Sequence, residues 1–389
     1  MASKPSQQGG SADKRTELRL DVRASLSGID PLAWNTLAGD NPFVRYELLH
    51  ALHETNCASE ETGWLPQFLT VWEGERLRGA MPLYLKSHSY GEYVFDWAWA
   101  DAYQRHGLKY YPKLLSAIPF SPVSAPKILA DDDAVRDLIA TAALDLGKQA
   151  SSLHVLFPTE AELLLLESKG MMVRRGVQFH WTNEAYSSFD EFLARFSHDK
   201  RKKIKQERRK VAEAGITFRR LTGSDIKAAD WAFFNRCYRG TYRAHHSTPY
   251  LNLAFFETLG EKMGENVLLV IAVRDGKPIA SALNVYTQEA LYGRYWGTLE
   301  YQPALHFEAC YYQALEFCIE RGIKVFEGGA QGEHKLARGF MPVEIRSAHW
   351  LKRPEFADAI ERFLAKEASG IGSYIDELRE HAPYKSEST

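Results

Sequence analysis

The sequence predicts an α/β protein in which one domain with a mixed β-sheet is present twice. Residues 71–93 match residues 273–295 without a gap when the second segment is moved back by 202 positions (276 − 74). Upstream, residues 41–54 match residues 248–261 at an offset of 207 (248 − 41). Such a small difference between offsets is typical of loops that differ in length between two copies of one fold. The 389 residues also exceed the ~250–300 at which a single core stops growing.

The second copy shows the order of elements most clearly. Apolar periodicity and turn residues predict a strand at 216–221, helices at 228–244 and 253–263, strands at 267–273, 279–286 and 291–297, a helix at 307–321, and strands at 324–327 and 345–351. Residues 267–273 are apolar throughout, as expected for a strand buried on both faces. Asp275-Gly276 predicts a hairpin turn, and Gly322 predicts the C-terminal cap of the helix before it.

The first copy is expected to repeat this order. It would place a strand at 18–22, helices at 34–37 and 43–54, strands within 68–85 and at 90–98, a helix at 110–118 and a strand at 153–157. The order resembles the acyl-CoA N-acyltransferase (GNAT) fold, a mixed sheet whose fourth and fifth strands splay apart to admit an acyl donor. We therefore predict a disordered tail at 1–15, GNAT-like domains at 16–180 and 215–381, a basic linking helix at 181–214 and a disordered tail at 382–389.

The linking segment carries a dense run of positive charge. Eight Lys or Arg residues fall within the eleven positions 200–210, and Lys202, Lys205 and Arg209 represent them. Because these cations repel one another, a bound anion would relieve a real cost, and the segment is a candidate surface for a nucleotide, a lipid-linked diphosphate or tRNA. The alternative is a solvated helix that rests on the protein along a thin apolar stripe.

The densest polar cluster follows the strand predicted at 324–327. Open α/β sheets bind their ligands at the carboxyl ends of such strands. His334 is a candidate general base for an amine, and Glu333 or Glu327 would orient it or serve instead. Glycine backbone amides and cations would contact an anionic substrate, and these candidates are Gly329, Gln331, Gly332, Lys335 and Arg338. The alternative is an ordinary turn with exposed polar residues.

A second cluster lies on the strand predicted at 291–297 and at the start of the next helix. Strand alternation places Tyr292, Arg294 and Trp296 on one face, where an arginine needs a carboxylate or a substrate as partner. The repeat pairs Arg294 with Glu92, a change of charge that favours a ligand site in the second copy only. His306 and Glu308 are further candidates beside the splay, although Glu308 would also favour the helix dipole in the first turn.

Composition narrows the function classes. The formal net charge of −2 argues against a general nucleic-acid binder, although not against a local basic surface. No apolar run approaches the ~20 residues of a membrane span, and the polar first fifteen residues lack the apolar core of a signal peptide. We therefore expect a cytoplasmic protein without a transmembrane segment. His306-x-Glu308 has no Pro-Cys-x-x-Cys after it, so no metal site is expected.

Residues 305–350 and 110–129, above all the GAQGEHK…RGF run at 329–340, resemble the FemAB-like "peptidoglycan biosynthesis/recognition" group of predicted N-acyltransferases. The resemblance implies tandem GNAT-like domains and transfer of an acyl group from acyl-CoA or aminoacyl-tRNA to an amine, on a small molecule, a cell-wall precursor or a peptide. Residues 298–304 lack the glycines of the R/Q-x-x-G-x-G/A turn with which GNAT enzymes bind coenzyme A, which leaves the donor open. The alternative function is a non-catalytic module that recognises a peptidoglycan-type or peptide ligand.

Overall fold

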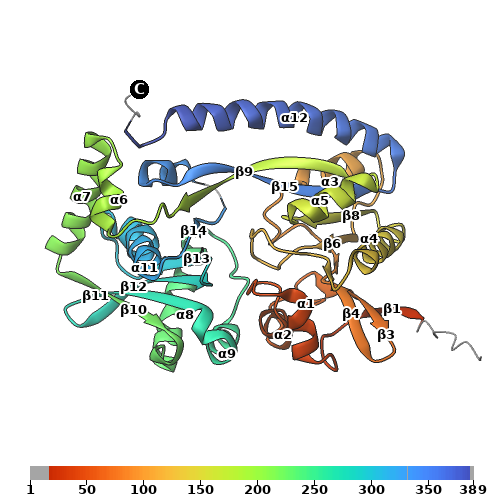
Figure 1. The fold of residues 1–389 in the computed structure, drawn as a ribbon, viewed down its shortest axis with the longest axis horizontal. Coiled ribbons are helices and arrows are strands. Elements are labelled where there is room, and N and C mark those ends of the chain that lie inside the picture. The colour runs from red at the N-terminus through yellow and green to blue at the C-terminus, as the bar shows by residue number, and fades with distance from the viewer. Residues whose placement is uncertain (1–16, 331, 386–389) are drawn as a thin grey trace, which may run out of the picture.

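The computed structural model describes residues 17–330 and 332–385, so Gln331 and the tail predicted at 1–15 lie outside the described residues. Two halves lie side by side (Figure 1). The first half comprises residues 17–171 and the second half residues 183–340; two long strands and a C-terminal helix run across both.

The first half begins as the repeat predicts and then diverges. Its elements are β1 (Leu18–Arg23), α1 (Pro31–Ala38), α2 (Tyr46–Glu54), β2 (Trp64–Pro66), β3 (Phe68–Glu73), β4 (Arg76–Met81), β5 (Tyr84–Lys86), α3 (Trp97–Arg105), β6 (Lys113–Ser116), β7 (Leu129–Ala130), α4 (Asp133–Gly147), β8 (Ser152–Leu156) and α5 (Glu160–Ser168).

The second half follows the predicted order closely. Its elements are α6 (Phe189–Ala194), α7 (His198–Glu213), β10 (Ile216–Thr222), α8 (Ala228–Ala244), α9 (Leu253–Met263), β11 (Val267–Arg274), β12 (Lys277–Tyr286), β13 (Ala290–Thr298), α10 (Leu305–Phe307), a π-helical turn (Glu308–Tyr312), α11 (Gln313–Arg321), β14 (Val325–Glu327) and a 3₁₀ segment (Glu333–Arg338). The elements that cross between the halves are β9 (Met172–Thr182), β15 (Met341–Leu351) and α12 (Pro354–Glu380).

The halves exchange their last strands. An eleven-stranded sheet has the order β10-β11-β12-β13-β14-β9-β15-β8-β6-β5-β2, and β1-β3-β4-β7 form a separate sheet. Strand β9 comes from the first half but pairs with β14, whereas β15 comes from the second half and pairs with β8. Helix α12 lies over β9 and β15 (Figure 1). Because these ladders cross the junction, the halves cannot separate without breaking strand pairs.

The duplication is visible in matching sheet edges. Strand β1 is antiparallel to β3, as β10 is to β11, and each hairpin that follows contains one β-bulge. The hairpin ends pair Glu73 with Arg76 and Arg274 with Lys277, so equivalent strand positions lie 201 residues apart (274 − 73). The sequence alignment that matched Gly74 with Gly276 used an offset of 202, so it misaligned these strands by one residue. Gly74 is the first residue of its turn, and Gly276 is the second residue of the other.

Two elements predicted for the first half are wrong. Residues 90–98, expected to form a strand, form a loop that leads into α3, and residues 110–118, expected to form a helix, contain strand β6. Strand β6 runs parallel to β8, as β13 does to β14, so β6 and not residues 90–98 takes the place of β13. The apparent pairing of Glu92 with Arg294 therefore has no structural counterpart. The sequence pattern of residues 110–118 did not predict β6, because this short strand is stabilised mainly by its neighbours in the sheet.

The linking segment contains two helices, α6 and α7, rather than the single predicted helix. The segment predicted to be a disordered tail at 382–389 is ordered as far as it is described, because Tyr384 forms a β-bridge with Phe196 and its hydroxyl donates to the carbonyl of Gly339 at 2.7 Å. Within residues 17–330 and 332–385, no helix has the length and apolar character needed to cross a membrane.

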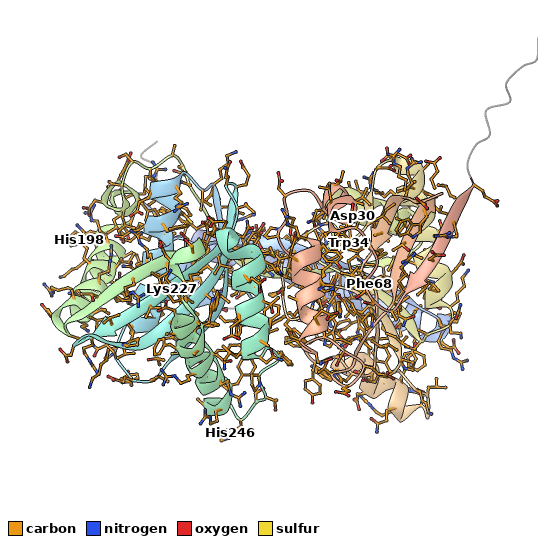
Figure 2. The ribbon with its side chains drawn as sticks, turned by 90° about the horizontal axis from the view of Figure 1, so that it is seen from below. Asp30, Trp34, Phe68, His198, Lys227 and His246 are labelled. Atoms are coloured by element: carbon orange, nitrogen blue, oxygen red, sulfur yellow. The ribbon has the colours of Figure 1, made fainter. Side chains whose placement is uncertain are left out.

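The core continues from one half into the other. The largest apolar cluster includes Trp34 and Phe68 of the first half together with Phe256 and Val285 of the second. Figure 2 shows Trp34 and Phe68 inside the first half and His246 at the exposed end of α8. Helices α2 and α9 lie against each other at this junction. The shared apolar core and the exchanged strands fix the relative position of the two halves.

Candidate active site

The candidate site lies where β13 and β14 part. Their parallel ladder pairs residues 290–292 with residues 325–327 and then ends. Beyond it a pocket of about 190 Å³ opens between the strands. Its wall includes four residues chosen from the sequence, Arg294, Trp296, His306 and Gly329. The predicted splay between the fourth and fifth strands is therefore present in the second half.

A β-bulge at Arg294 changes which side chains share a face. Leu283 pairs with Tyr295, but the next residue, Asn284, pairs with Gly293, so Arg294 is the extra residue. Tyr292 and Tyr295 consequently pack in the same apolar cluster, while Trp296 packs in another, on the opposite face. The prediction that Tyr292, Arg294 and Trp296 share one face is wrong, because a bulge shifts the alternation by one residue. The pocket wall includes both Tyr295 and Trp296, so it reaches both faces of the sheet.

The first half closes one side of this pocket. Tyr93 and Pro122 contribute to the wall. Arg294 Nη2 donates to the carbonyl of Phe120 at 2.6 Å, and the Tyr295 hydroxyl donates to the same oxygen at 3.0 Å. The site therefore lies at the junction of the halves, and its arginine is already held by the backbone of the first half.

Glu327 ends β14 at the point where the splay begins. Its side chain is partly exposed, yet its Oε2 is buried and has no hydrogen-bond partner among the residues that the structure describes. Burial raises the pKa of Glu327 to about 8, against the opposing charges of Arg294 and Lys127. A carboxyl with such a pKa gains and loses a proton near neutral pH, which suits a general acid or base.

Lys335 holds the glycine-rich loop after β14. Its buried ammonium donates to the carbonyls of Gly329 at 3.0 Å and Ala330 at 3.4 Å. Burial lowers the pKa of Lys335 to about 8. Gly329 and Gly332 have φ angles of 78° and 113°, which favour glycine. Lys335 therefore shapes the loop beside the pocket.

His334 lies at the edge of the pocket and is exposed. Its Nε2 lies 3.0 Å from the hydroxyl of Tyr311, a residue of the pocket wall. Partial burial, followed by the charges of Lys335 and Arg338, lowers the pKa of His334. His334 thus reaches the pocket through Tyr311. Glu333 is directed elsewhere, since its carboxylate accepts a hydrogen bond from Tyr374 of α12 at 2.5 Å.

Glu308 and Arg338 join the second half to α7. The buried carboxylate of Glu308 accepts from Arg208 Nη2 at 3.0 Å and from Gln313 at 2.8 Å. Arg338 lies 3.3 Å from the ring centroid of Phe307 and donates to Glu207 at 2.9 Å. These side chains, expected to support catalysis and to bind an anion, are instead engaged with α7. Glu308 begins a π-helical turn, a feature often found at functional sites.

The basic surface of α7 faces away from these contacts. Lys202, Lys205 and Arg209 are exposed. Lys205 lies 3.5 Å from Asp190, and Arg209 lies 3.6 Å from Glu213. Exposed pairs of this kind contribute little to stability. The three cations stay a candidate surface for an anion, separate from the pocket.

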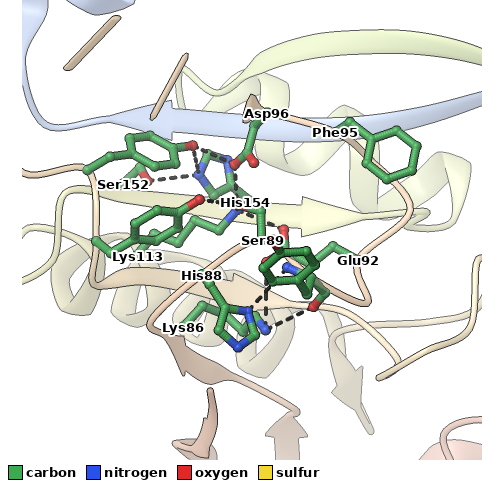
Figure 3. Close-up of polar contacts among 12 residues, drawn as sticks. Lys86, His88, Ser89, Glu92, Phe95, Asp96, Lys113, Ser152 and His154 are labelled. Carbon is green, nitrogen blue, oxygen red and sulfur yellow. Dashed lines mark hydrogen bonds and ion pairs between the residues drawn. The ribbon is translucent and has the colours of Figure 1, made fainter. Parts of the chain in front are cut away.

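The first half contains a buried ionic cluster that the sequence analysis did not predict (Figure 3). Lys113 Nζ donates to Glu92 at 2.7 Å, to Ser89 at 2.8 Å and to Asp96. The cluster fixes the loop before α3, which carries Tyr93 into the wall of the pocket. Lys113 stands within an otherwise apolar run, and a buried charge needs a partner, so this lysine was the available signal.

A mixed sheet whose fourth and fifth strands part over a pocket defines the GNAT class of acyltransferase folds, and here that fold is duplicated. The profile of the FemAB-like family, described as peptidoglycan biosynthesis/recognition, matches residues 25–386. The chain therefore belongs to the FemAB-like family.

Solved structures with the same fold are distant in sequence. FemX has 13% identity and a TM-score of 0.54, over 86% of this chain and 98% of that chain. The C-terminal domain of a protein named lysylphosphatidylglycerol synthetase, from Agrobacterium fabrum, has 10% identity and a TM-score of 0.52, over 84% and 92%. L-PGS from Bacillus licheniformis has 10% identity and a TM-score of 0.50, over 83% and 97%. No curated protein matches the sequence.

Proposed function

We propose that the chain transfers an acyl or aminoacyl group from acyl-CoA or aminoacyl-tRNA to an amine acceptor, such as a cell-wall precursor or a peptide. The observation that carries this proposal is the pocket between β13 and β14, which opens just beyond the last pair of their ladder, Tyr292 with Glu327. The family description favours an acceptor from peptidoglycan synthesis. The printed names of FemX and lysylphosphatidylglycerol synthetase favour aminoacyl transfer within this class.

The donor's acyl carbon would lie in the pocket, and the acceptor amine would approach from the first half. Glu327 then takes a proton from the amine nitrogen as the new C–N bond forms. The bond from the acyl carbon to the donor sulfur or oxygen breaks, and the leaving thiolate or alkoxide takes up the proton that Glu327 removed from the amine, which returns Glu327 to its carboxylate form. Backbone N–H groups along the unpaired edge of β13 and near Gly329 would stabilise the oxyanion.

A direct test compares Glu327→Gln with His334→Ala. Each protein is incubated with acyl-CoA and aminoacyl-tRNA donors and a panel of amines, and products are detected by mass spectrometry. We expect Glu327→Gln to lower turnover by ~10²–10⁴, the usual contribution of a general base. Glu333→Gln is the matched control, because this carboxylate is directed to α12.

The pH dependence separates the two candidate bases. If Glu327 is the base, turnover rises with pH up to about 8, the pKa to which burial raises this carboxyl. If His334 is the base, the rise ends below the ordinary histidine pKa, because burial and nearby cations lower the pKa of His334. Full activity in Glu327→Gln would contradict the assignment.

A second candidate is a non-catalytic module for a peptidoglycan-type or peptide ligand. It is favoured by the engagement of Arg294 with the carbonyl of Phe120 and of Arg338 with Glu207, which leaves fewer groups to act on a substrate. Binding of peptidoglycan peptides without turnover of any donor would support this second candidate over the first.

A further inference from the structure

A separate hollow of about 590 Å³ lies at one end of the sheet in the second half. Its wall comes from the turn after β10, the first residues of α8, the C-terminal part of α9 and the turn before β11. Thr222 pairs with Leu268 and Tyr286 with Leu291, so the hollow is at the end where β13 begins. The pocket between β13 and β14 opens farther along β13, and among the described residues the two walls share none.

Acidic side chains give this hollow its charge. Glu257, Glu261 and Glu265 belong to the wall, and all three are exposed. Glu261 is already paired with Lys262 at 2.6 Å. Within residues 17–330 and 332–385, Glu257 and Glu265 form no ion pair and no side-chain hydrogen bond. Two carboxylates therefore face the hollow without a cation.

The backbone around the hollow leaves room for one of these carboxylates. A Cβ at Gly223 would lie 2.2 Å from Oε1 of Glu265, so only glycine lets the carboxylate lie there. Lys227, which precedes α8 (Figure 2), does not neutralise it, because its ammonium donates to the carbonyl of Ser224 at 2.6 Å. The charge of Glu265 is thus held at the hollow and left for a ligand.

Trp231 supplies an independent observation. The residue is only 4% exposed, and its ring lies parallel to that of Phe256 in the core. In the part of the chain that the structure describes, its indole N–H has no acceptor. This edge of the ring reaches the hollow, because a Cβ at Gly260, another residue of the wall, would lie 2.5 Å from Nε1. A donor on so buried a side chain is costly to leave unpaired, so the hollow calls for an oxygen acceptor at this point.

These features narrow the chemistry of the ligand. Two unpaired carboxylates repel an anion, so the oxygen that meets Trp231 is uncharged, as in a carbonyl. The carboxylates themselves call for a positive charge. A metal ion does not fit, because no group of three or more His, Cys, Asp or Glu side chains among the described residues could hold one. A peptide with a basic side chain offers both a carbonyl and a cation.

We propose that this hollow binds an arginine-bearing segment of a partner protein. Its guanidinium groups pair with Glu257 and Glu265, and a backbone carbonyl of the segment accepts the hydrogen bond of Trp231. A guanidinium matches a carboxylate through two parallel hydrogen bonds and stays charged at neutral pH. For the same reason it is no nucleophile for acyl transfer. The proposal therefore goes beyond the proposed function and does not depend on Glu327.

The test follows the indole N–H signals of the full chain by NMR, with ¹⁵N-labelled tryptophan. The chain has nine tryptophans, and Trp231→Phe assigns the signal by removing it. The probe is a hexapeptide of alternating arginine and alanine with both ends blocked. Two comparison ligands are the same peptide with glutamate for arginine, and spermidine, a cation without a carbonyl. We expect the arginine peptide to shift the Trp231 signal until it saturates, the glutamate peptide to leave it in place, and spermidine to move it less.

A charge variant tests the carboxylates and keeps the tryptophan as reporter. Glu257→Gln combined with Glu265→Gln should raise the Kd of the arginine peptide about threefold or more, as expected for two exposed ion pairs. The matched control, Glu377→Gln combined with Glu380→Gln, removes the same charge from exposed positions of α12 and should leave the Kd within about twofold. All four changes are at exposed side chains, so the melting temperatures should match that of the wild type.

Three results would overturn the proposal. One is a Trp231 signal that does not move at millimolar arginine peptide. Another is an equal shift with the glutamate peptide or with spermidine. The last is a Kd that rises equally in the α12 control, which would show a general effect of net charge.

Discussion

Arg338 Nη2 donates to Glu207 Oε1 at 2.9 Å, which ties the glycine-rich loop after β14 to α7. The side chains of Arg338 and Glu207 are only 5% and 13% exposed, so this ion pair is largely removed from water. The same carboxylate accepts a hydrogen bond from Tyr312. The loop beside the pocket therefore depends on the basic helix for its position.

Removing one partner of this pair should destabilise the fold. Glu207→Leu leaves the Arg338 charge buried and unpaired, and we expect a loss of ~3–5 kcal/mol in the free energy of unfolding. Glu207→Leu combined with Arg338→Met should recover part of that loss, because no charge is then left unpaired. Urea unfolding measures both. Arg209→Ala, an exposed change on the same helix, is the control, and an equal loss there would contradict the explanation.

The carboxyl of Glu327 should make stability depend on pH. Burial raises its pKa from 4.5 to about 8, so the folded state binds the proton more tightly than the unfolded state. The resulting stabilisation is fully present below pH 4.5 and is lost as the pH rises through 8. Glu327→Gln stays neutral, so it should gain stability over the wild type by about 1.4 kcal/mol for each unit of pKa shift.

Unfolding of Glu327→Gln and of the wild type in urea at pH 5, 7 and 9 measures this effect. The difference in stability between the two proteins should widen as the pH rises. Glu333→Gln is the control for losing a carboxylate elsewhere on the same loop. A difference that stays constant from pH 5 to 9 would show that Glu327 does not bind its proton more tightly in the folded state.

The buried cluster of the first half should be sensitive to Lys113. Lys113→Met leaves the carboxyl groups of Glu92 and Asp96 buried without their ammonium partner. We expect the free energy of unfolding to fall by ~3–5 kcal/mol. Burial raises the pKa of Glu92 to about 7, so acidification below pH 7 should reduce the loss. Lys109→Met, at an exposed position nearby, should change stability by less than ~0.5 kcal/mol. Similar melting temperatures for the two variants would refute a structural role for the cluster.

Gly297 should tolerate no side chain. A Cβ there would lie 2.1 Å from the carbonyl oxygen of Cys237, so Gly297→Ala would force α8 away from β13. We expect the free energy of unfolding to fall by ~1–3 kcal/mol or more, as it does in overpacked cores. Gly370→Ala, in α12 with nothing within 4 Å, should instead stabilise by about 1 kcal/mol. Thermal unfolding of both variants checks the opposite signs.

Much of the second half could be predicted from its sequence. The apolar run at 267–273, the hairpin at Asp275-Gly276 and the cap at Gly322 all define β11, β12 and α11 through interactions between near neighbours. The glycines and cations after β14 likewise marked the loop beside the pocket. These features are local, so the sequence carries them directly.

Tertiary structure decided what these local patterns could not. The exchange of β9 and β15, the bulge at Arg294 and the strand at 113–116 are set by partners more than a hundred residues away or by neighbouring strands. Glu308 and Arg338 were predicted from the sequence as candidate site residues, and in the structure each forms an ion pair with a residue of α7. The sequence by itself determined the fold class and the place where its strands diverge. Which polar side chains stay unpaired there depended on how distant segments pack, because a charge is available to a substrate only when no other part of the chain binds it.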